Sequence, residues 1–524
     1  MCGIAGWIDH ERDLRSQSSI LEAMSYQLRN RGPDASGEWM SPNALIAHRR
    51  LSVVDPEGGG QPMIRQLDGC TYVITYNGEL YNTMDLRKAL ENRGHVFHSN
   101  SDTEVLLVSY IEWGDKCVER FNGIYAFGIW NEKERTLFLA RDRFGVKPLF
   151  YAQRGNSFVF ASELKAMLAN PLIEPVVTSE GLAEVFALGP ARTPGNGVYK
   201  DVNELKPAHC LFFDTAGIHI RKYWGLESQP HRDTLEVTTN NVRELVLDSI
   251  ERQFVSDVPV CCFLSGGLDS SAITALASKY FRQKGQILNT YSIEYRDNEK
   301  YFTPSLFQPD SDTPWIKRMS EEAGTQHHYF TVDTQQVVEA LYSAVEARDL
   351  PGMADIDSSL WLFCREVKKG ATVTLSGECA DEVFGGYPWF FKEDMLNANT
   401  FPWSVNMSER NNIMSRSLMD SIKPDEYVHR RYSETLEEVP RLPGDTAIEA
   451  RRREMFYLNF TWFMQTLLEG SVTKANDGQS LKSILISSSV TVILLMTAFA
   501  TDFFCSRLYK AQLSTYSCKS PILI

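Results

Sequence analysis

Cys2, which directly follows the initiator methionine, is the residue of this chain best placed to act as a nucleophile. Removal of Met1 would make it an N-terminal cysteine, whose own α-amino group has a pKa near ~8 and can accept the thiol proton directly or through a water molecule. The small residues Gly3, Ala5 and Gly6 leave room for a ligand close to the backbone. A cysteine that merely precedes a strand would give the same short motif, so this interpretation depends on the rest of the chain.

Polar loop segments in the first half contain the other groups that an amide hydrolase needs. Asn77 and Gly78 follow a strand and offer a side-chain amide and an unobstructed backbone N–H, the two donors of an oxyanion hole. Arg50 could bind the α-carboxylate of a free amino acid, and Asp102 its α-ammonium group. Simpler interpretations are a hairpin turn for Asn-Gly, a surface cation for Arg50 and a helix N-cap for Asp102. The combination with Cys2 favours the catalytic interpretation.

The second half contains a loop rich in glycine and serine between an apolar strand and a helix. Residues 258–264 are continuously apolar, which is typical of a strand buried on both faces of a parallel sheet. The loop Ser-Gly-Gly-Leu-Asp-Ser-Ser follows at 265–271, and residues 272–281 have helical spacing. Backbone N–H groups, hydroxyl groups and the positive end of a helix together favour a phosphate ligand. The loop lacks the Gly-Lys-Thr ending of a Walker loop.

A second motif follows the strand predicted at 371–375. Residues 376–387 read Ser-Gly-Glu-Cys-Ala-Asp-Glu-Val-Phe-Gly-Gly-Tyr, so carboxylates lie next to glycines. Hard cations such as Mg²⁺ take oxygen ligands, which makes Asp269 and Asp381 the candidate metal ligands. Glu378 is a candidate general base toward ammonia. A solvated helix start is the alternative, and the pairing with the earlier loop argues against it.

These motifs carry a resemblance to a known family. Cys-Gly-Ile, Arg-Gly-Pro-Asp, His-x-Arg-Leu, Asn-Gly-Glu and Ser-Asp-Thr-Glu, in this order, resemble the class II, N-terminal-nucleophile glutamine amidotransferases. Ser-Gly-Gly-x-Asp-Ser resembles the pyrophosphate loop of ATP pyrophosphatases, and both halves together resemble glutamine-hydrolysing asparagine synthetase over about residues 1–468. Cys379 departs from the pattern, because the family usually has glycine there, and this narrows the backbone freedom at that position.

The resemblance implies a role for each residue. Cys2 would be the nucleophile, Asn77 and Gly78 the oxyanion hole, and Glu378 the base that takes a proton from attacking ammonia. The residues implied in glutamine binding are Arg50, Leu51, Val54, Asn77, Gly78, Glu79 and Asp102. Those implied in ATP binding are Leu264, Ser265, Gly266, Gly267, Asp269, Ser270, Ile293, Ser376 and Gly377, with Asp269 and Asp381 as Mg²⁺ ligands.

The implied reaction converts aspartate, ATP and glutamine into asparagine, AMP, pyrophosphate and glutamate through a β-aspartyl-AMP intermediate, with ATP and Mg²⁺ as cofactors. Ammonia must travel inside the protein, because in bulk water it would be protonated and lose its nucleophilicity, so we expect a dry passage between the two sites. Two alternatives stay open. One is an amidotransferase of the same architecture that acts on another carboxylate, and the other is a catalytically defective protein that is tethered to a membrane or paired with an intact synthetase.

The patterns of strands and helices that must position these residues predict two different architectures for the two halves. Short β-type runs such as 71–76 and 136–140, with helical periodicity at 20–28 and 103–113, predict an α+β unit of layered antiparallel sheets of the Ntn-hydrolase type. The later apolar runs, which include 290–295, predict an α/β unit with a parallel sheet. We expect a glutamine amidotransferase domain over 2–210, a linker over 211–235 and an ATP-pyrophosphatase-type synthetase domain over 236–468.

Composition limits the class of partner. Hydrophobic residues make up 43% and charged residues 23% of the chain, and the net charge of -14 argues against nucleic acid, since a phosphate-binding face normally shows a basic excess. The ten cysteines have no metal-ligand spacing, so we expect reduced thiols in a cytoplasmic protein. Charged residues near the start interrupt any signal peptide. A membrane partner is not expected, and a homodimer stays open.

Residues 469–524 depart from the family pattern. They lack Arg-x-x-Met, Gly-Leu-Glu-x-Arg-x-Pro-Phe and a later basic segment that would contact phosphates. We favour a frameshift or a mispredicted exon, and a tail anchor over Ser483–Thr501, which carries no charge, is the alternative. Without the basic segment the departing pyrophosphate would lose electrostatic support, so we expect impaired synthesis, with residual glutaminase activity at most.

Overall fold

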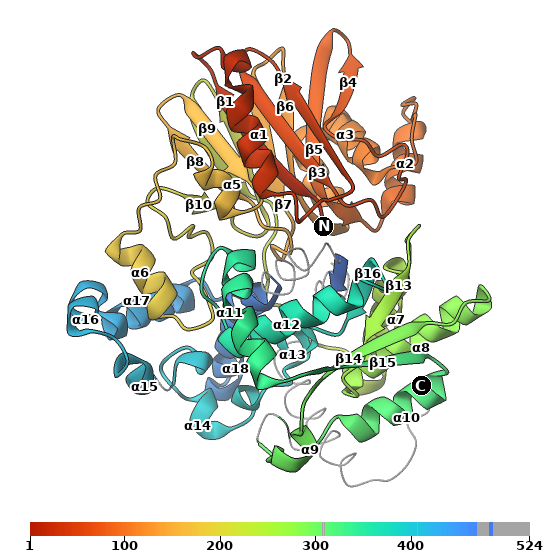
Figure 1. Ribbon diagram of the computed structural model, residues 1–524, viewed down its shortest axis with the longest axis vertical. Helices are drawn as coiled ribbons and strands as arrows, with labels where there is room; N and C mark the ends of the chain where they lie inside the picture. Colours follow the sequence, from red (N-terminus) through yellow and green to blue (C-terminus); the bar gives the residue numbers. More distant parts are fainter. Residues whose placement is uncertain (306–307, 309, 406, 469–481, 486–524) are drawn as a thin grey trace.

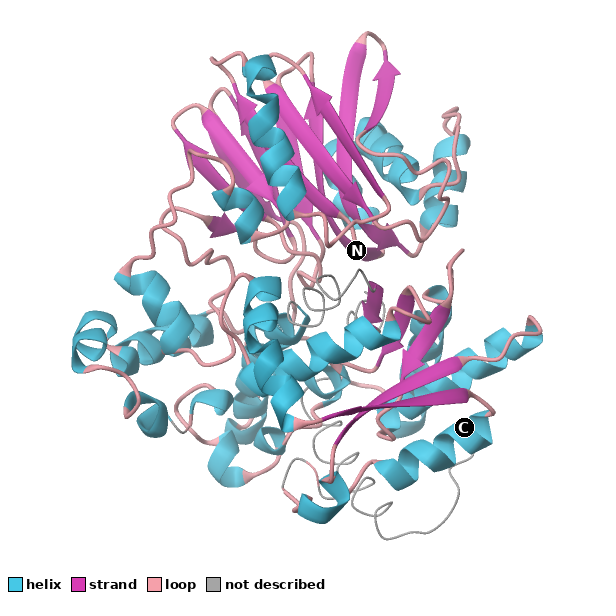
Figure 2. Ribbon diagram, in the orientation of Figure 1, coloured by secondary structure: helices cyan, strands magenta, loops and turns pink. Residues whose placement is uncertain are grey.

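The computed structural model describes residues 1–305, 308, 310–405, 407–468 and 482–485 of the 524-residue chain. Figures 1 and 2 show two parts, one above the other in this view: antiparallel sheets with the N-terminus, and a parallel sheet among helices. The predicted fold class, an α+β unit followed by an α/β unit, is confirmed.

Two six-stranded antiparallel sheets face each other in the first half. Successive residues of the first strand point to opposite faces: Ile4 and Ile8 join the core between the sheets, whereas Ala5 and Trp7 pack under the outer helices. The first sheet has the order β10 (Asn203–Glu204), β8 (Phe150–Arg154), β9 (Ser157–Ala161), β1 (Gly3–Asp9), β3 (Ala44–Arg50), β2 (Ala35–Met40). The second has the order β12 (Gly217–Lys222), β11 (His209–Asp214), β7 (Thr136–Arg141), β6 (Gly123–Asn131), β5 (Cys70–Leu80), β4 (Met63–Leu67).

Helices cover the outer faces of both antiparallel sheets. Leu21, Met24 and Leu28 of the first helical segment lie at helical spacing and are buried on the first sheet. The helices predicted at 20–28 and 103–113 are present as α1 and α3. The first sheet is covered by α1 (Ser18–Gln27) and α5 (Leu164–Leu168), and the second by α2 (Thr83–Glu91), α3 (Asp102–Trp113) and α4 (Cys117–Arg120).

A parallel sheet forms the centre of the second half. Cys261 and Cys262 point to opposite faces of its middle strand, into two separate apolar clusters. Burial raises the pKa of Cys261 to about 12 and holds that of Cys262 well above its ordinary value, so both act as small core side chains. The order is β15 (Gln326–Val332), β14 (Asn289–Tyr295), β13 (Val260–Phe263), β16 (Val373–Ser376), β17 (Lys482–Leu485). The last strand lies within the stretch 469–524.

Helices flank both faces of this sheet. Ile250, Ile273 and Ala277 cover one face, and Val337, Phe363 and Val367 cover the other. The flanking helices are α7 (Leu235–Arg252) and α8 (Leu268–Gln283) on one face, and α11 (Thr334–Arg348) and α12 (Ala354–Val367) on the other. The remaining helices are α6 (Ser179–Phe186), α9 (Asn298–Tyr301), α10 (Thr313–Ala323), α13 (Ala380–Phe384), α14 (Glu393–Leu396), α15 (Met407–Asn411), α16 (Arg416–Ile422), α17 (Pro424–Glu437) and α18 (Ala447–Leu458).

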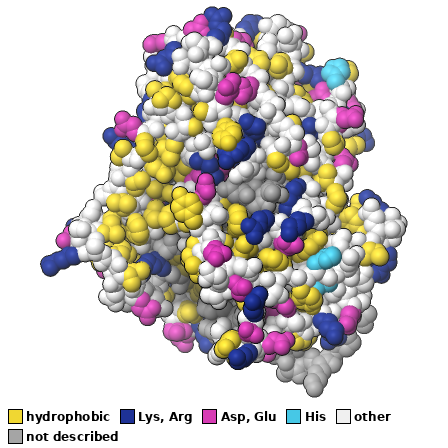
Figure 3. All heavy atoms as spheres, viewed as in Figure 1, with side chains coloured by type: hydrophobic (Ala, Val, Ile, Leu, Met, Phe, Trp, Pro, Cys, Tyr) yellow, Lys and Arg dark blue, Asp and Glu magenta, His cyan; other side chains and the backbone are white. Residues whose placement is uncertain are grey.

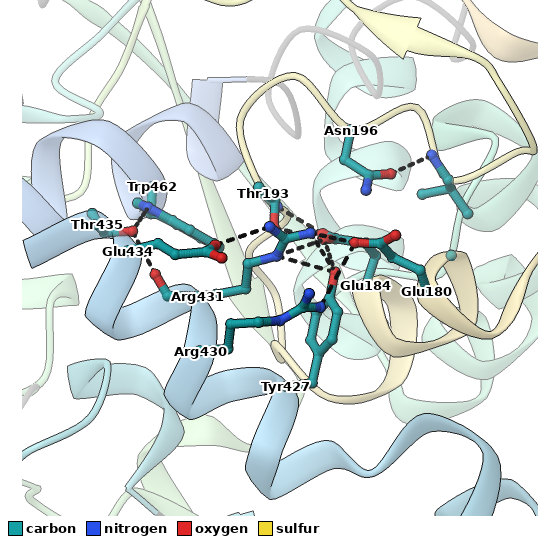
Figure 4. Close-up of polar contacts among 12 residues, drawn as sticks. Glu180, Glu184, Thr193, Asn196, Tyr427, Arg430, Arg431, Glu434, Thr435 and Trp462 are labelled. Atoms are coloured by element: carbon teal, nitrogen blue, oxygen red, sulfur yellow. Dashed lines mark hydrogen bonds and ion pairs between the residues drawn. The ribbon is translucent and has the colours of Figure 1, made fainter. Parts of the chain in front are cut away.

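A polar network joins α6 of the first half to α17 of the second (Figure 4). The fully buried carboxylate of Glu184 accepts hydrogen bonds from the backbone N–H and Oγ1 of Thr193, at 2.7 and 2.6 Å, and from the Tyr427 hydroxyl. Arg431 pairs with Glu180 at 2.5 Å. Apolar side chains of α6 and α17 pack around this network, so the two halves meet in a satisfied, mostly buried contact.

An ionic chain forms a second link between the halves. Arg31 Nε donates to the carbonyl oxygen of Cys2 at 2.9 Å, and its Nη1 lies 2.7 Å from Glu163. Lys165 Nζ lies 3.3 Å from the same Glu163 carboxylate and 3.4 Å from Asp349, which follows α11. Burial raises the pKa of Asp349 to about 7, against the opposing effect of Lys165. The backbone of Cys2 is therefore held by Arg31, which is connected through Glu163 and Lys165 to Asp349 of the second half.

The stretch between the two halves is partly strand and partly irregular. β11 and β12 continue the second sheet into the stretch 211–235, where we expect a linker, and residues 223–234 contain neither helix nor strand.

Acidic and basic side chains intermingle on the face shown in Figure 3. In the part of the chain that the structure describes, no helix has the length and apolarity needed to cross a membrane. Apart from 483–485, the segment Ser483–Thr501 lies outside the described residues.

Candidate active sites

A pocket at the N-terminus, the thiol pocket, gathers all the residues predicted to act in glutamine hydrolysis. It lies at the ends of β1, β3 and β5 and at the start of α3. Residues far apart in sequence meet here because β1 pairs with β3 in one sheet and both strands contact β5 of the facing sheet. The pocket is lined by Met1, Cys2, Arg50, Leu51, Val53, Val54, Gly59, Gln61, Tyr76, Asn77, Gly78, Glu79, Ser101, Asp102, Thr103 and Lys147.

The thiol of Cys2 is activated by its surroundings. Its Sγ lies 3.7 Å from the carbonyl oxygen of Leu51. Burial opposes ionisation, but His48 and the N-terminal ammonium outweigh it and lower the thiol pKa to about 6. A thiol with this pKa is mostly thiolate at neutral pH, and the thiolate is the nucleophilic form.

Asn77 and Gly78 provide hydrogen-bond donors beside the thiol. The side-chain amide Nδ2 of Asn77 is buried and has no hydrogen-bond partner among the described residues, an arrangement that suits a ligand oxygen. A Cβ at Gly78 would lie 2.3 Å from the carbonyl oxygen of Ile124, so only glycine fits. Both residues lie inside β5, paired with Ala126 and Tyr125, rather than in a segment after a strand or in a hairpin turn.

Charged groups of opposite sign lie at the other end of the pocket. Arg50 ends β3, and its guanidinium is held by the carbonyl oxygens of Asp55 and Pro56 at 2.7 and 2.6 Å. Asp102 is the first residue of α3, whose N-cap is Ser101, and its Oδ2 accepts the Tyr76 hydroxyl at 2.9 Å. A fixed cation and a fixed carboxylate can bind the α-carboxylate and α-ammonium of a free amino acid.

The second site, the nucleotide edge, lies at the carboxyl ends of the parallel strands. β14 and β16 lie on opposite sides of β13, so the strand order has a topological switch point at β13. Ligands of open α/β sheets bind in the crevice at such a point. Residues 264–267 connect β13 to α8, so Asp269 and Ser270 lie in the first turn of the helix. Gly266 has φ +77, the left-handed region that favours glycine. The hydroxyl groups of Ser265 and Ser270 lie 3.0 Å apart.

The loop after β16 packs directly against this first loop. A Cβ at Gly377 would lie 2.9 Å from the Cβ of Asp269, so the two loops approach as closely as glycine permits. The Glu378 N–H donates to Ser376 Oγ at 3.3 Å. Cys379 adopts φ 72, where the family's usual glycine would be relaxed, and its thiol is buried against Met464.

The other two predicted nucleotide-binding residues lie on the same edge. Leu264 follows β13 and is buried, and its backbone N–H donates to Tyr291 at 2.9 Å. Its carbonyl oxygen accepts the Ser292 hydroxyl. Ile293 lies on β14 and packs against the α11 and α12 side. All residues predicted for ATP therefore lie on or directly after β13, β14 and β16.

Two carboxylates at the nucleotide edge fit a divalent cation. Burial and then the charge of Asp381 raise the pKa of Asp269 to about 6, and burial raises the pKa of Asp381. A bound cation would relieve this repulsion, and Mg²⁺ commonly uses one or two carboxylates together with phosphate oxygens. The described residues contain no group of three or more metal-binding side chains, so the protein alone does not form a full cage.

An apolar cluster, the interdomain cluster, connects the two sites. It contains Met1 next to the nucleophile, Cys379 from the loop after β16, and side chains from both halves between them. Phe144 contacts Phe460 edge-on, with ring centroids 5.5 Å apart. Its buried members are Met1, Ile124, Phe144, Val146, Cys379, Phe460, Met464 and Leu468.

Comparison with known proteins assigns each half to a family. The family described as "Glutamine amidotransferase domain" matches residues 1–224, and the family described as "Asparagine synthase" matches residues 241–483. Asparagine synthetase [glutamine-hydrolyzing] 3 of Bacillus subtilis is 53% identical over 470 residues, which cover 90% of this chain and 76% of that protein. The chain belongs to the glutamine-hydrolysing asparagine synthetase family.

Two other relatives are less similar to this chain. Asparagine synthetase [glutamine-hydrolyzing] 1 of Bacillus subtilis is 32% identical over 74% of this chain, and amidase chry2 of Gibberella zeae is 30% identical over 78%. The chain spans 59% and 62% of these two proteins. The match to the asparagine synthase family reaches residue 483, so it extends into the stretch 469–524 and includes the start of β17.

One residue of the thiol pocket's surroundings was missed by sequence reasoning. His48 lies in the His-x-Arg-Leu motif, but nothing in the sequence indicates that it would lower the pKa of the Cys2 thiol. The pairing of β3 with β1 places His48 opposite Ile4, two residues from Cys2. Its presence in a family motif, two residues before Arg50, was the available signal.

Proposed function

We propose that this asparagine synthetase family member hydrolyses glutamine in the thiol pocket and transfers the released ammonia to aspartate that has been activated with ATP at the nucleotide edge. The products would be asparagine, AMP, pyrophosphate and glutamate. The observation that carries the proposal is that both sites border one apolar cluster, which contains Met1 at one end and Cys379 at the other.

Glutamine hydrolysis would begin with attack of the Cys2 thiolate on the side-chain amide carbon. Asn77 Nδ2 and the Gly78 N–H would stabilise the oxyanion, because both are fixed before the charge develops. Arg50 and Asp102 would hold the amino-acid end of the substrate. Collapse of the tetrahedral intermediate releases ammonia and leaves a thioester, which water hydrolyses to glutamate and free thiol.

Aspartate activation would take place at the loop of residues 265–270. Its backbone N–H groups and the N-terminus of α8 would hold the pyrophosphate portion of ATP. The aspartate side-chain carboxylate would attack the α-phosphorus, giving β-aspartyl-AMP and pyrophosphate. Mg²⁺, held by Asp269 and Asp381, would supply positive charge next to the phosphate oxygens. Glu378 would take a proton as ammonia attacks the acyl carbon and AMP leaves.

The interdomain cluster would provide the passage for ammonia. Neutral ammonia needs a path without water, and the buried members of the cluster between the two loops are apolar side chains. Phe460 and Met464 lie on the helical segment that follows α18. We expect bulky polar substitutions in the cluster to separate glutamine hydrolysis from amide transfer.

Isotope transfer tests the proposal. The purified chain is incubated with aspartate, Mg·ATP and glutamine that carries ¹⁵N in its amide, and labelled asparagine is measured by mass spectrometry. Cys2→Ala should abolish glutamine-dependent asparagine formation and glutamate release, whereas ammonium-dependent formation should persist. Glutamate release by Cys2→Ala at the wild-type rate would refute the assignment of the nucleophile.

The same assay addresses the divergent stretch 469–524. Because it lacks the basic segment expected beside the phosphates, we expect asparagine formation to be slower than glutamate release. Equal rates of the two products would contradict this expectation.

A different acceptor is the second candidate, because the chain is also 30% identical to an amidase. Pyrophosphate release measured with aspartate and with a panel of other carboxylates distinguishes the two. Faster release with another carboxylate would favour an amidotransferase of different specificity.

A further inference from the structure

Asp349 of the second half reaches the first turn of α5 in the first half. It follows α11 and begins a short turn, residues 349–353, that leads into α12. Its Oδ2 accepts the backbone N–H of Lys165 at 3.1 Å, and its Oδ1 lies 3.4 Å from Lys165 Nζ. Glu163 occupies the N-cap position of α5, but its side chain makes no capping hydrogen bond. Asp349 therefore caps α5 from the other half of the protein.

The turn that carries Asp349 is fixed on both sides of the contact. Leu350 packs against the apolar cluster beneath α1 and α5 of the first half. In the second half, Asp357 of α12 accepts the backbone N–H of Met353 at 3.1 Å and lies 3.3 Å from Arg348 Nη1. A carboxylate held in this way can fix the position of the groups that it binds.

The carboxylate of Glu163 lies between two cations. Its Oε2 is 3.3 Å from Lys165 Nζ, and its Oε1 is 2.7 Å from Arg31 Nη1. Arg31 is fully buried, and its Nε donates to the carbonyl oxygen of Cys2 at 2.9 Å. Its Nη2 has no hydrogen-bond partner among the residues that the structure describes. The position of this guanidinium therefore depends on Glu163, and a displaced Glu163 would move the group that holds the backbone of the nucleophile.

We propose that Asp349 is a positioning residue of the thiol pocket, because the ionic chain that begins at its carboxylate ends on the backbone of Cys2. The inference rests on the proposed hydrolysis of glutamine and adds a residue of the second half to it. Asp349 is not among the residues that line the thiol pocket, so it acts through the position of the nucleophile. The glutaminase site is then complete only when the second half is docked on α5.

Loss of the Asp349 charge would disturb the chain in two ways. The ammonium of Lys165 would be drawn wholly to the Glu163 carboxylate, which would weaken the hold of that carboxylate on Arg31. The N–H of Lys165 would also lose its ionised acceptor, so the first turn of α5 would be held less firmly. Both changes shift Glu163, which directly precedes that turn.

The groups that would hold glutamine lie outside this chain. Arg50 ends β3 and Asp102 begins α3, and both line the thiol pocket. A change at Asp349 should therefore lower the kcat of glutamine hydrolysis while KM stays the same. This split separates a displaced nucleophile from weakened substrate binding.

The first measurement is the rate of glutamate release by Asp349→Asn. Asparagine keeps the size of the side chain and tolerates the φ of 65 at this position. The assay is run at pH 8.5, because burial raises the pKa of Asp349 to about 7 and the wild-type carboxylate must be charged. We expect kcat to fall about tenfold, since a displacement of ~1 Å costs about 10²-fold and part of the chain remains in place. KM should stay within about twofold of wild type.

Two variants serve as controls. Glu346→Gln lies at an exposed position of α11, three residues before Asp349, and should leave kcat unchanged. Tyr427→Phe weakens the other contact between the halves by removing the hydrogen bond to Glu184, and it should also leave the glutaminase kcat unchanged. A loss of kcat in Tyr427→Phe as large as that in Asp349→Asn would show that any loosening of the two halves slows hydrolysis, and it would overturn the inference.

A double-mutant cycle tests the route through Glu163. Glu163→Gln alone should lower kcat, because it removes the charged partner of Arg31. Adding Asp349→Asn to this variant should lower kcat by less than about twofold more, since the two changes interrupt one chain. Full multiplication of the two effects would show that Asp349 acts independently of the chain and would overturn the inference.

The outcomes separate the inference from the proposed function. A kcat of Asp349→Asn within about twofold of wild type, or a loss that lies wholly in KM, overturns the role of Asp349 and leaves Cys2 as the nucleophile. Wild-type glutamate release by Cys2→Ala overturns the proposed function itself. If Asp349→Asn fails to fold by circular dichroism, Lys165→Met carries the same expectation, because it interrupts the chain at a partly exposed residue.

Discussion

Replacing Asp381 by asparagine should stabilise the ligand-free protein while abolishing its response to Mg·ATP. Asp269 and Asp381 lie together at the nucleotide edge, and burial with the charge of Asp381 raises the pKa of Asp269 to about 6. Asparagine keeps the size of the side chain and removes one of the two charges. The repulsion between these two carboxylates therefore destabilises the folded protein when no cation is bound.

The magnitude follows from linkage between ionisation and folding. A carboxyl whose folded pKa lies above its unfolded value binds its proton more tightly when folded, so the free energy of unfolding falls as pH rises from about 4 to about 6 and stays low above that. The shift of Asp269, from 3.8 to about 6, corresponds to at most ~3 kcal/mol at ~1.4 kcal/mol per pKa unit. Burial contributes more to the pKa shift of Asp269 than the charge of Asp381 does, and the Asp269 side chain is partly exposed. We therefore assign about 1 kcal/mol of destabilisation to the charge of Asp381.

Calorimetry of the unfolding transition tests this. At pH 8, Asp381→Asn should raise the midpoint of the second half by about 2 °C, and the gain should shrink at pH 4, where Asp269 is protonated in both proteins. Saturating Mg·ATP, at about 100 times its Kd, should stabilise the wild type by ~2.7 kcal/mol and the variant hardly at all. Asp394→Asn, at an exposed carboxylate, is the control. A variant that is less stable than wild type at pH 8, or one that still responds to Mg·ATP, would refute the reasoning.

Two further predictions concern the thiol pocket and the contact between the halves. Asn77→Ala removes one oxyanion donor, so glutaminase kcat should fall by about 10²- to 10³-fold while the rate of Cys2 alkylation stays unchanged. The control, Asn92→Ala at an exposed position, should leave kcat unchanged. An unaltered kcat in Asn77→Ala would contradict the assignment of the donor. Tyr427→Phe removes a hydrogen bond to the buried Glu184 carboxylate, so the free energy of unfolding should fall by about 1.5–3 kcal/mol. Calorimetry measures this fall, with Tyr342→Phe at an exposed position as the control. Equal stability of the two variants would show that the polar network does not hold α6 and α17 together.

Local sequence patterns determined the elements and the chemistry that each loop offers. The continuous apolar run at 258–264 predicted a buried parallel strand, and β13 forms the middle of the sheet because a strand covered on both faces needs apolar side chains on both. The spacing at 20–28 and 103–113 predicted two helices whose apolar faces cover the antiparallel sheets. The residues of the Asn-Gly-Glu motif were identified, but their conformation was not, because the dipeptide alone favours a turn and only pairing with β6 keeps β5 extended through it.

The tertiary structure alone decided which of these groups interact. The register between β1 and β3 places His48 opposite Ile4, two residues from Cys2, and a shift of one residue would turn the imidazole to the opposite face of the sheet. The close approach of Gly377 to Asp269 sets the repulsion between two carboxylates that are more than a hundred residues apart in sequence. Sequence fixes which residues carry acid, base and nucleophile because chemistry belongs to side-chain types. Their pKa values depend on distance and burial, which exist only once the chain has folded.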